Sequence, residues 1–293
     1  MPAERAQARI ICFPFAGGGA SVFQRWFSSV PDTVQVCPVE LPGRETRFGE
    51  TLLRDVTAVI QELAPTAARY LDRPYVIFGH SLGGFLGFEL ARELRRRSLR
   101  LPFHFFASAC RAPHLPSRME PVHDADVTVF LNRLGQIGGL PHLTKQSPEM
   151  MELLLPIVRA DFQMAEQYRF VNEPAFDFPV TALGGSQDRF VCAGDLVAWH
   201  THTTGPFRLR LLAGGHLFLS ASPERVIRDT RIPVLLIHGQ MDNNIPIRHS
   251  RRLHALNPAT TELWEVAGAE HVESVSRAPE AYARRVTEFL ASH

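Results

Sequence analysis

This chain of 293 residues has no long hydrophobic run and no excess of charge of either sign. No stretch reaches the roughly 18 apolar residues that identify a transmembrane helix, and the first residues lack the apolar region of a signal peptide. The formal net charge is +1, so no basic or acidic surplus predicts binding to nucleic acid or to an anionic membrane. These absences predict a cytoplasmic protein that binds neither.

Cysteine is scarce, and its four occurrences, at positions 12, 37, 110 and 192, lie far apart. Their spacing matches neither a zinc site nor a disulfide framework. Cys12, Cys37 and Cys110 lie in or beside apolar runs typical of strands, and we expect all four, Cys192 included, to be reduced core thiols with no bound metal. The length and the 45% apolar content suit one large α/β domain, or one domain with an appendage.

The most informative segment is Gly-His-Ser-Leu-Gly at positions 79–83. It follows the apolar run 75–78 and precedes residues 85–94, whose apolar positions have helical spacing, so Ser81 lies at a sharp turn from strand to helix. The two glycines leave room for a strained backbone that would push the Ser81 hydroxyl out of the sheet. This context predicts a nucleophile elbow, and the alternative is an ordinary Gly-rich turn.

Apolar runs alternate with helical patterns through the first part of the chain. The runs 9–13, 34–39 and 102–109 predict further strands, and residues 52–71 predict a helix that leads to the strand before Ser81. Near-continuous apolar strands are what a sheet covered on both faces requires. The expected fold class is therefore α/β, with a mostly parallel central sheet flanked by helices.

Residues from about 111 to 177 have a different pattern, in which helix-like segments are broken by Gly-Gly and Pro. Between two strands of one sheet this stretch is too long for a plain loop, so it predicts a helical lid over the active site. Six apolar residues of the lid either line an acyl channel or pack the lid onto the core. They are Met150, Met151, Leu154, Leu155, Ile157 and Val158.

Two later segments that resemble strands are followed by an acid and a base, Asp188 and His216. Ser81, Asp188 and His216 occur in the chain order of an α/β-hydrolase triad. A serine is a weak nucleophile until a histidine takes its proton, and that histidine needs a carboxylate on its other nitrogen to fix its tautomer. The pattern therefore predicts a catalytic triad. The alternative for Asp188 and His216 is a helix cap or a core position.

A Gly-rich turn, Pro14–Ala20, follows the first predicted strand. It lacks the Lys-Ser/Thr pair of a P-loop and the G-x-G-x-x-G spacing of a dinucleotide site. In a serine hydrolase such a turn donates a backbone hydrogen bond to the oxyanion, and here the Ala16 amide is the favoured donor. The Leu82 amide, at the helix start behind Ser81, is the expected second donor. The alternative is a tight loop with no catalytic role.

Residues 9 to about 222 closely resemble the type II thioesterases that accompany nonribosomal peptide synthetases and polyketide synthases. The matching segments are Cys12–Gly18, Leu41–Arg44, Gly79–Gly84, Arg111–Pro113, Gly138–Pro141, Leu155–Asp161 and Gly214–His216.

The resemblance implies an α/β-hydrolase fold with a mobile helical lid. It also implies a stand-alone hydrolase that removes acyl groups from the phosphopantetheine arm of carrier proteins and so clears misprimed or stalled chains. Ser81, Asp188 and His216 would be its triad, and Ala16 and Leu82 its oxyanion donors. The resemblance implies transient binding of an acyl or peptidyl carrier protein, and no cofactor beyond the phosphopantetheine that the substrate carries.

Residues 231–293 depart from this pattern and resemble the C-terminal end of a different, prolyl-oligopeptidase-like group of α/β-hydrolases. Two more segments that resemble strands end in Asp242 and His271, an alternative acid/base pair. If two strands were added at the sheet edge, each about 4.8 Å further out, His271 would lie roughly 10 Å from the triad position. The two pairs therefore cannot both serve Ser81.

We expect a hydrolase domain over residues 1–228 and an appended segment over residues 229–293. The alternative is that the tail displaces residues 179–216 from the sheet. Two other functions are considered: a carboxylesterase or acyl-CoA hydrolase with the same triad, and a non-catalytic docking protein whose site the tail blocks. The triad does not separate thioesters from esters, because both react through the same tetrahedral oxyanion.

Overall fold

The structure is a computed structural model, and it divides the chain into two compact units, Met1–Val226 and Ile227–His293. The residues that it describes are 6–30, 33–138, 148–221, 234–243, 247, 248, 250, 251, 254, 261–270 and 273–292.

The first unit is built on a six-stranded sheet in which every pair of neighbouring strands is parallel. Its strands are β1 (Ala8–Phe13), β2 (Val34–Pro38), β3 (Tyr75–His80), β4 (His104–Ser108), β5 (Val180–Gly185) and β6 (Phe207–Leu212). Their order in the sheet is β2-β1-β3-β4-β5-β6. The central strands β3, β4 and β5 are buried along their whole length, whereas β2 and β6 at the edges are partly exposed. The apolar runs of the sequence therefore form the central strands, as predicted.

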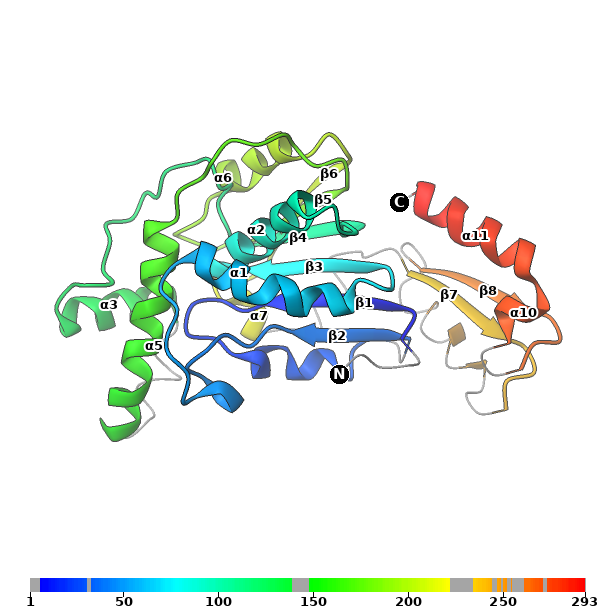
Figure 1. Cartoon of the computed structure of the whole chain (residues 1–293), viewed down its shortest axis with the longest axis horizontal. Helices are drawn as coiled ribbons and strands as arrows, with labels where there is room; N and C mark the ends of the chain where they lie inside the picture. The colour runs from blue at the N-terminus through cyan, green and yellow to red at the C-terminus, as the bar shows by residue number, and fades with distance from the viewer. Residues whose placement is uncertain are drawn as a thin grey trace. The chain divides into compact units, whose positions relative to one another are not determined.

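Helices cover the sheet and occupy the long connection between β4 and β5. The α-helices of this unit are α1 (Val56–Ala67), α2 (Leu82–Arg96), α3 (Val127–Ile137), α5 (Pro148–Gln167), α6 (Ala193–Val197) and α7 (Phe218–Ala221). The short 3-10 helices are η1 (Ala20–Trp26), η2 (Glu45–Arg47), η3 (Ala68–Tyr70) and η4 (Ala198–His202). Helices α1 and α2 pack on each other, and α2 packs on β1, β3 and β4 (Figure 1).

Helix α1 is shorter than the predicted helix over 52–71. Its first turn is fixed by Asp55, whose side chain accepts the amide hydrogen of Ala58 at 3.0 Å. An aspartate at this position satisfies an amide that has no partner within the helix, so the helix begins there and not at residue 52.

The expected lid contains α3 and α5, which stand beside the carboxyl ends of the strands (Figure 1). The end of α5 is fastened to α2. The ring of Tyr168, which follows α5, stacks on Phe85 of α2 at a centroid distance of 4.6 Å, and its hydroxyl donates to Glu89 at 2.6 Å. These contacts join the C-terminal end of the lid to the helix that begins at Ser81.

The second unit contains the parallel pair β7 (Val234–Gly239) and β8 (Thr261–Val266), with α10 (Ser274–Arg277) and α11 (Pro279–Ser292). Within the described part of the chain, β7 and β8 pair only with each other. The alternative in which the tail displaces residues 179–216 is wrong, because β5 and β6 keep their places in the six-stranded sheet.

Three expected absences can be compared with the described residues. None of the described helices combines the length and the apolarity that a membrane span requires. No three His, Cys, Asp or Glu side chains in the described ranges gather as metal ligands would. All four cysteines are free, but the core placement is wrong for Cys192, which is exposed because it lies in the turn before α6 and not in a strand.

Candidate active site

Ser81 lies between the last residue of β3 and the first residue of α2, and its backbone is strained, with φ 55° and ψ −118°. The two flanking glycines are required by close contacts. A Cβ atom on Gly79 would lie 2.1 Å from the carbonyl oxygen of Gly83, and one on Gly83 would lie 2.3 Å from the carbonyl oxygen of Phe13. The backbone can therefore make this turn only with glycine at both positions. The local structure has the form of a nucleophile elbow.

The three residues proposed as a triad form a continuous chain of hydrogen bonds. Ser81 Oγ lies 2.9 Å from Nε2 of His216, and Nδ1 of His216 lies 2.8 Å from Oδ2 of Asp188. Asp188 follows β5 and His216 follows β6, so the ends of adjacent parallel strands bring the acid and the base together. With Nδ1–H donating to the carboxylate, Nε2 is free to accept the serine proton.

Asp188 is held in the charged form that such a chain needs. Burial alone would raise the pKa of this carboxyl. The hydrogen bond to His216 and those from the amides of Phe190, at 2.8 Å, and Val191, at 3.2 Å, outweigh burial and hold the pKa of Asp188 below its ordinary 3.8. Three donors to one carboxylate stabilise the anion. Asp188 is therefore ionised at neutral pH.

His80 holds the backbone of His216 in place, a role that the sequence did not predict. It is completely buried, with Nδ1 2.9 Å from Ser108 Oγ and Nε2 3.0 Å from the carbonyl oxygen of His216. Burial, with the nearby His216, lowers the pKa of His80 to about 3, so the ring is neutral and donates from Nε2 to that carbonyl. The signal in the sequence was the position of His80 directly before Ser81 in the Gly-His-Ser-Leu-Gly segment.

The Gly-rich turn after β1 brings Ala16 to the cavity that Ser81 and His216 line. The neighbouring amides are occupied: Gly17 donates to Asp161 Oδ2 at 2.7 Å, and Gly18 donates to the carbonyl of Phe15 at 2.8 Å. Within the described residues the amides of Ala16 and Leu82 have no acceptor. Both amides are therefore available to an oxyanion formed at Ser81.

A buried ion pair beside this turn was also missed by the sequence reasoning. Arg44 and Asp161 form two hydrogen bonds, of 2.7 and 2.8 Å. Each residue ends a segment that matched the thioesterase pattern, which is the only signal that the sequence offered. The two residues are too far apart in the chain for any local pattern to pair them.

A cavity of about 660 Å³ opens beside Ser81 and His216. Apolar residues of the lid form much of its lining: Leu134, Ile137, Leu154, Ile157, Val158 and Phe162. Three of the six predicted channel residues are among them. Met150 is instead 41% exposed, Leu155 packs on a small cluster around Phe130, and Met151 lies outside the lining. The lid therefore contributes both channel and packing residues.

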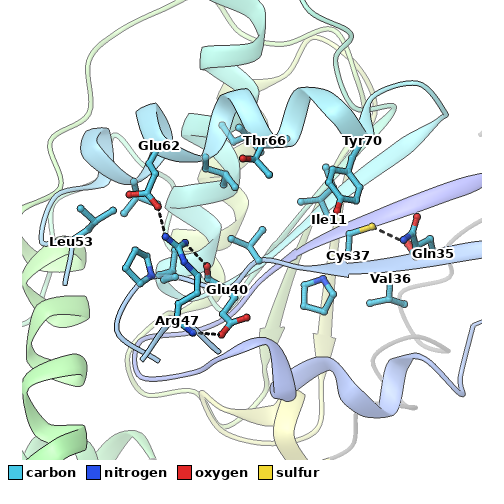
Figure 2. A pocket seen from close by; sticks show the side chains of 18 residues that line it. Ile11, Gln35, Val36, Cys37, Glu40, Arg47, Leu53, Glu62, Thr66 and Tyr70 are labelled. Atoms are coloured by element: carbon cyan, nitrogen blue, oxygen red, sulfur yellow. Dashed lines mark hydrogen bonds and ion pairs between the residues drawn. The ribbon is translucent and has the colours of Figure 1, made fainter. Parts of the chain in front are cut away.

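Figure 2 shows another cavity, of about 530 Å³, between β2 and α1. Arg47 and Cys37 line this cavity, and Arg47 pairs with Glu62 at 2.6 Å. Burial raises the pKa of the Cys37 thiol to about 11, so little thiolate is present at neutral pH. Neither Ser81 nor His216 lines this cavity, and the cavity beside them is the candidate substrate site.

The alternative acid/base pair belongs to the second unit. Asp242 Oδ2 lies 3.6 Å from Nε2 of His238, which is beyond hydrogen-bond distance. His271 lies outside the described residues. The chain of hydrogen bonds from Ser81 is complete within the first unit through His216 and Asp188.

The chain is similar to known thioesterases in sequence and in fold. A family model for the thioesterase domain matches residues 8–231. The gramicidin S biosynthesis protein GrsT of Aneurinibacillus migulanus is 36% identical over 222 residues, which are 76% of this chain and 87% of GrsT. RedJ, a thioesterase of the prodiginine pathway of Streptomyces coelicolor, is 35% identical with a TM-score of 0.71, over 75% of this chain and 87% of RedJ.

The chain is also similar to a solved type II thioesterase. YbtT, a type II thioesterase of the yersiniabactin nonribosomal peptide and polyketide pathway, is 31% identical with a TM-score of 0.67, over 78% of this chain and 93% of YbtT. The family model covers most of the chain, and the solved relatives share the predicted α/β-hydrolase fold. The chain therefore belongs to the thioesterase family, and its solved relative YbtT is a type II thioesterase of a nonribosomal peptide and polyketide pathway.

Proposed function

We propose that this thioesterase hydrolyses acyl groups from the phosphopantetheine arm of acyl or peptidyl carrier proteins, and so clears misprimed or stalled synthases. Ser81 is the nucleophile, His216 the general base and Asp188 the carboxylate that orients it. The observation that carries the proposal is the unbroken chain of hydrogen bonds from Ser81 to Asp188 beside an apolar cavity of about 660 Å³.

The geometry supports a two-step reaction. His216 takes the proton of Ser81 Oγ as the oxygen attacks the thioester carbonyl, and the oxyanion accepts hydrogen bonds from the Ala16 and Leu82 amides. The imidazolium, stabilised by Asp188, then protonates the departing pantetheine thiolate and leaves an acyl-enzyme. Water attacks this ester with His216 again as base, which releases the acid and restores Ser81. No step needs a cofactor, because the phosphopantetheine belongs to the substrate.

The cavity supports an acyl substrate. Its lid side is apolar, so it suits a hydrocarbon chain, and burial of that chain favours binding by roughly 0.8 kcal/mol per CH₂. The relatives' pathways favour a carrier protein as the partner, since GrsT and RedJ are named for gramicidin S and prodiginine biosynthesis.

The proposal divides the chain into a catalytic domain and an appended segment. Residues 1–228, with the lid at about 111–177, form the thioesterase domain, and residues 229–293 form an appended segment. The family match to residues 8–231 and the compact unit that ends at Val226 support this division. Because Asp242 then lies outside the catalytic domain, it has no part in the reaction.

The test is a comparison of kcat/KM for one acyl group presented on a holo carrier protein, on coenzyme A and as a p-nitrophenyl ester. We expect the carrier-bound thioester to be the best substrate. Equal values for all three would indicate a general esterase or acyl-CoA hydrolase. No turnover of any of them, with an intact fold, would indicate a non-catalytic protein.

A further inference from the structure

The lid helix and the Gly-rich turn meet at the buried ion pair of Arg44 and Asp161. Asp161 of α5 is fully buried and Arg44 is 6% exposed. Their hydrogen bonds run from Nη1 to Oδ2 at 2.7 Å and from Nη2 to Oδ1 at 2.8 Å. A paired guanidinium and carboxylate of this kind is strong and directional. The pair therefore fixes one face of α5 against the segment before η2.

Both partners also hold the backbone of the turn. Asp161 Oδ2 accepts the amide hydrogen of Gly17 at 2.7 Å, and Arg44 Nη1 donates to the carbonyl of Gly18 at 3.0 Å. One turn earlier on α5, Val158 lies so close that a Cβ on Gly17 would be 3.0 Å from it. Helix α5 thus supports the turn through a charge and through packing.

These contacts determine where the Ala16 amide points. The turn closes through the Gly18 amide and the Phe15 carbonyl, and Gly17 has φ +80°, typical of the third position of a type II turn. The Phe15 carbonyl and the Ala16 N–H share one planar peptide, so fixing the carbonyl fixes the N–H. Asp161 fixes the next peptide through the Gly17 amide.

We propose that Asp161 and Arg44 are positioning residues that hold the Ala16 amide where the oxyanion forms, so that the lid helix takes part in stabilising the transition state. The inference rests on the proposed roles of Ser81 and Ala16. It predicts an effect on the charged transition state and little effect on the bound thioester, because an interaction that strengthens only in the transition state changes kcat and not KM.

The test replaces Asp161 with asparagine and measures kcat, KM and the affinity for two inhibitors. A trifluoromethyl ketone with the substrate's acyl chain forms an oxyanion on Ser81, whereas the matching thioether does not. We expect Asp161→Asn to lower kcat by roughly 10- to 100-fold, less than the loss of a whole oxyanion donor, with KM nearly unchanged. The ketone should lose affinity by the same factor, and the thioether should bind as before.

A matched control is Glu173→Gln, which removes a charge that pairs at 2.8 Å with the buried Arg92 of α2, away from the turn. It should lower the melting temperature and leave kcat unchanged. If Asp161→Asn behaves like this control, or weakens both inhibitors equally, the positioning role is refuted.

If Asp161→Asn does not fold, Arg44→Lys is judged by the same criteria, since lysine keeps the charge and loses the paired hydrogen bonds. Failure of the proposed function would look different, because it is measured on the wild-type protein: no turnover, or no preference for the carrier-bound thioester. A wild-type enzyme that is active and an Asp161→Asn variant with full kcat would refute only the positioning role.

Discussion

Single residues of this protein are held in one protonation state by burial and by their partners. His80, His104 and His202 are buried, and burial lowers their pKa values to about 3, about 4 and about 4. Each is therefore neutral in the folded protein at neutral pH. In the unfolded chain each returns to its ordinary pKa of 6.5.

This difference predicts how stability depends on pH. Between about 3 and 6.5 the unfolded chain binds a proton that folded His80 does not, so the free energy of unfolding falls as the pH is lowered through this range. His80→Gln should reduce the slope of the free energy of unfolding against pH by up to about 1.4 kcal/mol per pH unit, which is the slope that one proton produces. Urea unfolding at pH 7, 6 and 5 measures this slope for the wild type and the variant.

Asp188 does not interfere with this measurement, because its lowered pKa, below 3.8, affects stability only at more acidic pH. Identical slopes for the variant and the wild type would contradict this.

The carboxylate of the triad has a prediction of its own. Asp188→Asn keeps the shape but offers His216 the wrong hydrogen-bond partner, so kcat should fall by about 10⁴. Asp242→Asn, in the second unit, is the matched control and should change kcat little. Steady-state hydrolysis of one acyl thioester compares them. Loss of activity in Asp242→Asn with a tolerated Asp188→Asn would move the site to the second acid.

At the scale of elements, α5 presents different residues to the cavity and to solvent. Leu154 lines the cavity beside Ser81, whereas its neighbour Leu153 is 50% exposed. Leu154→Trp should therefore shorten the acyl chain that fits, and lower kcat/KM for long chains relative to short ones by about tenfold. Leu153→Trp is the control on the same helix. A series of acyl thioesters of increasing length measures both, and equal selectivity in the two variants would show that α5 does not set chain length.

Elements and catalytic residues were predictable to different degrees. Apolar runs predicted β1 to β4, and the two glycines around Ser81 predicted the elbow, because both signals are local. The segments that form β5 and β6 were predicted as strands that precede an acid and a base, and β6 alternates apolar residues with arginine. The chain order of Asp188 and His216 predicted that the two side chains meet, because adjacent parallel strands end at the same edge of the sheet. The Arg44–Asp161 pair was not predictable, since its partners come from a turn and a helix that meet only in the fold. Likewise, no sequence pattern separates Leu154 from Met150 on α5.

At the scale of the whole molecule, the two compact units predict that the second is dispensable for catalysis. Removing residues 229–293 should leave kcat/KM within about twofold, because the triad, both oxyanion donors and the described cavity lining lie in Met1–Val226. Kinetics on the shortened and the full chain test this, with circular dichroism to verify the fold. A folded but inactive shortened protein would contradict the proposed division.

The central claim is that Ser81 carries the acyl group. Its most direct test is reaction of the full chain with a fluorophosphonate, followed by intact mass measurement and peptide mapping. We expect one adduct per chain, on Ser81. Ser81→Ala should abolish the adduct and lower turnover by several orders of magnitude, because the triad acts as a unit. An adduct on another residue, or turnover that survives Ser81→Ala, would contradict it.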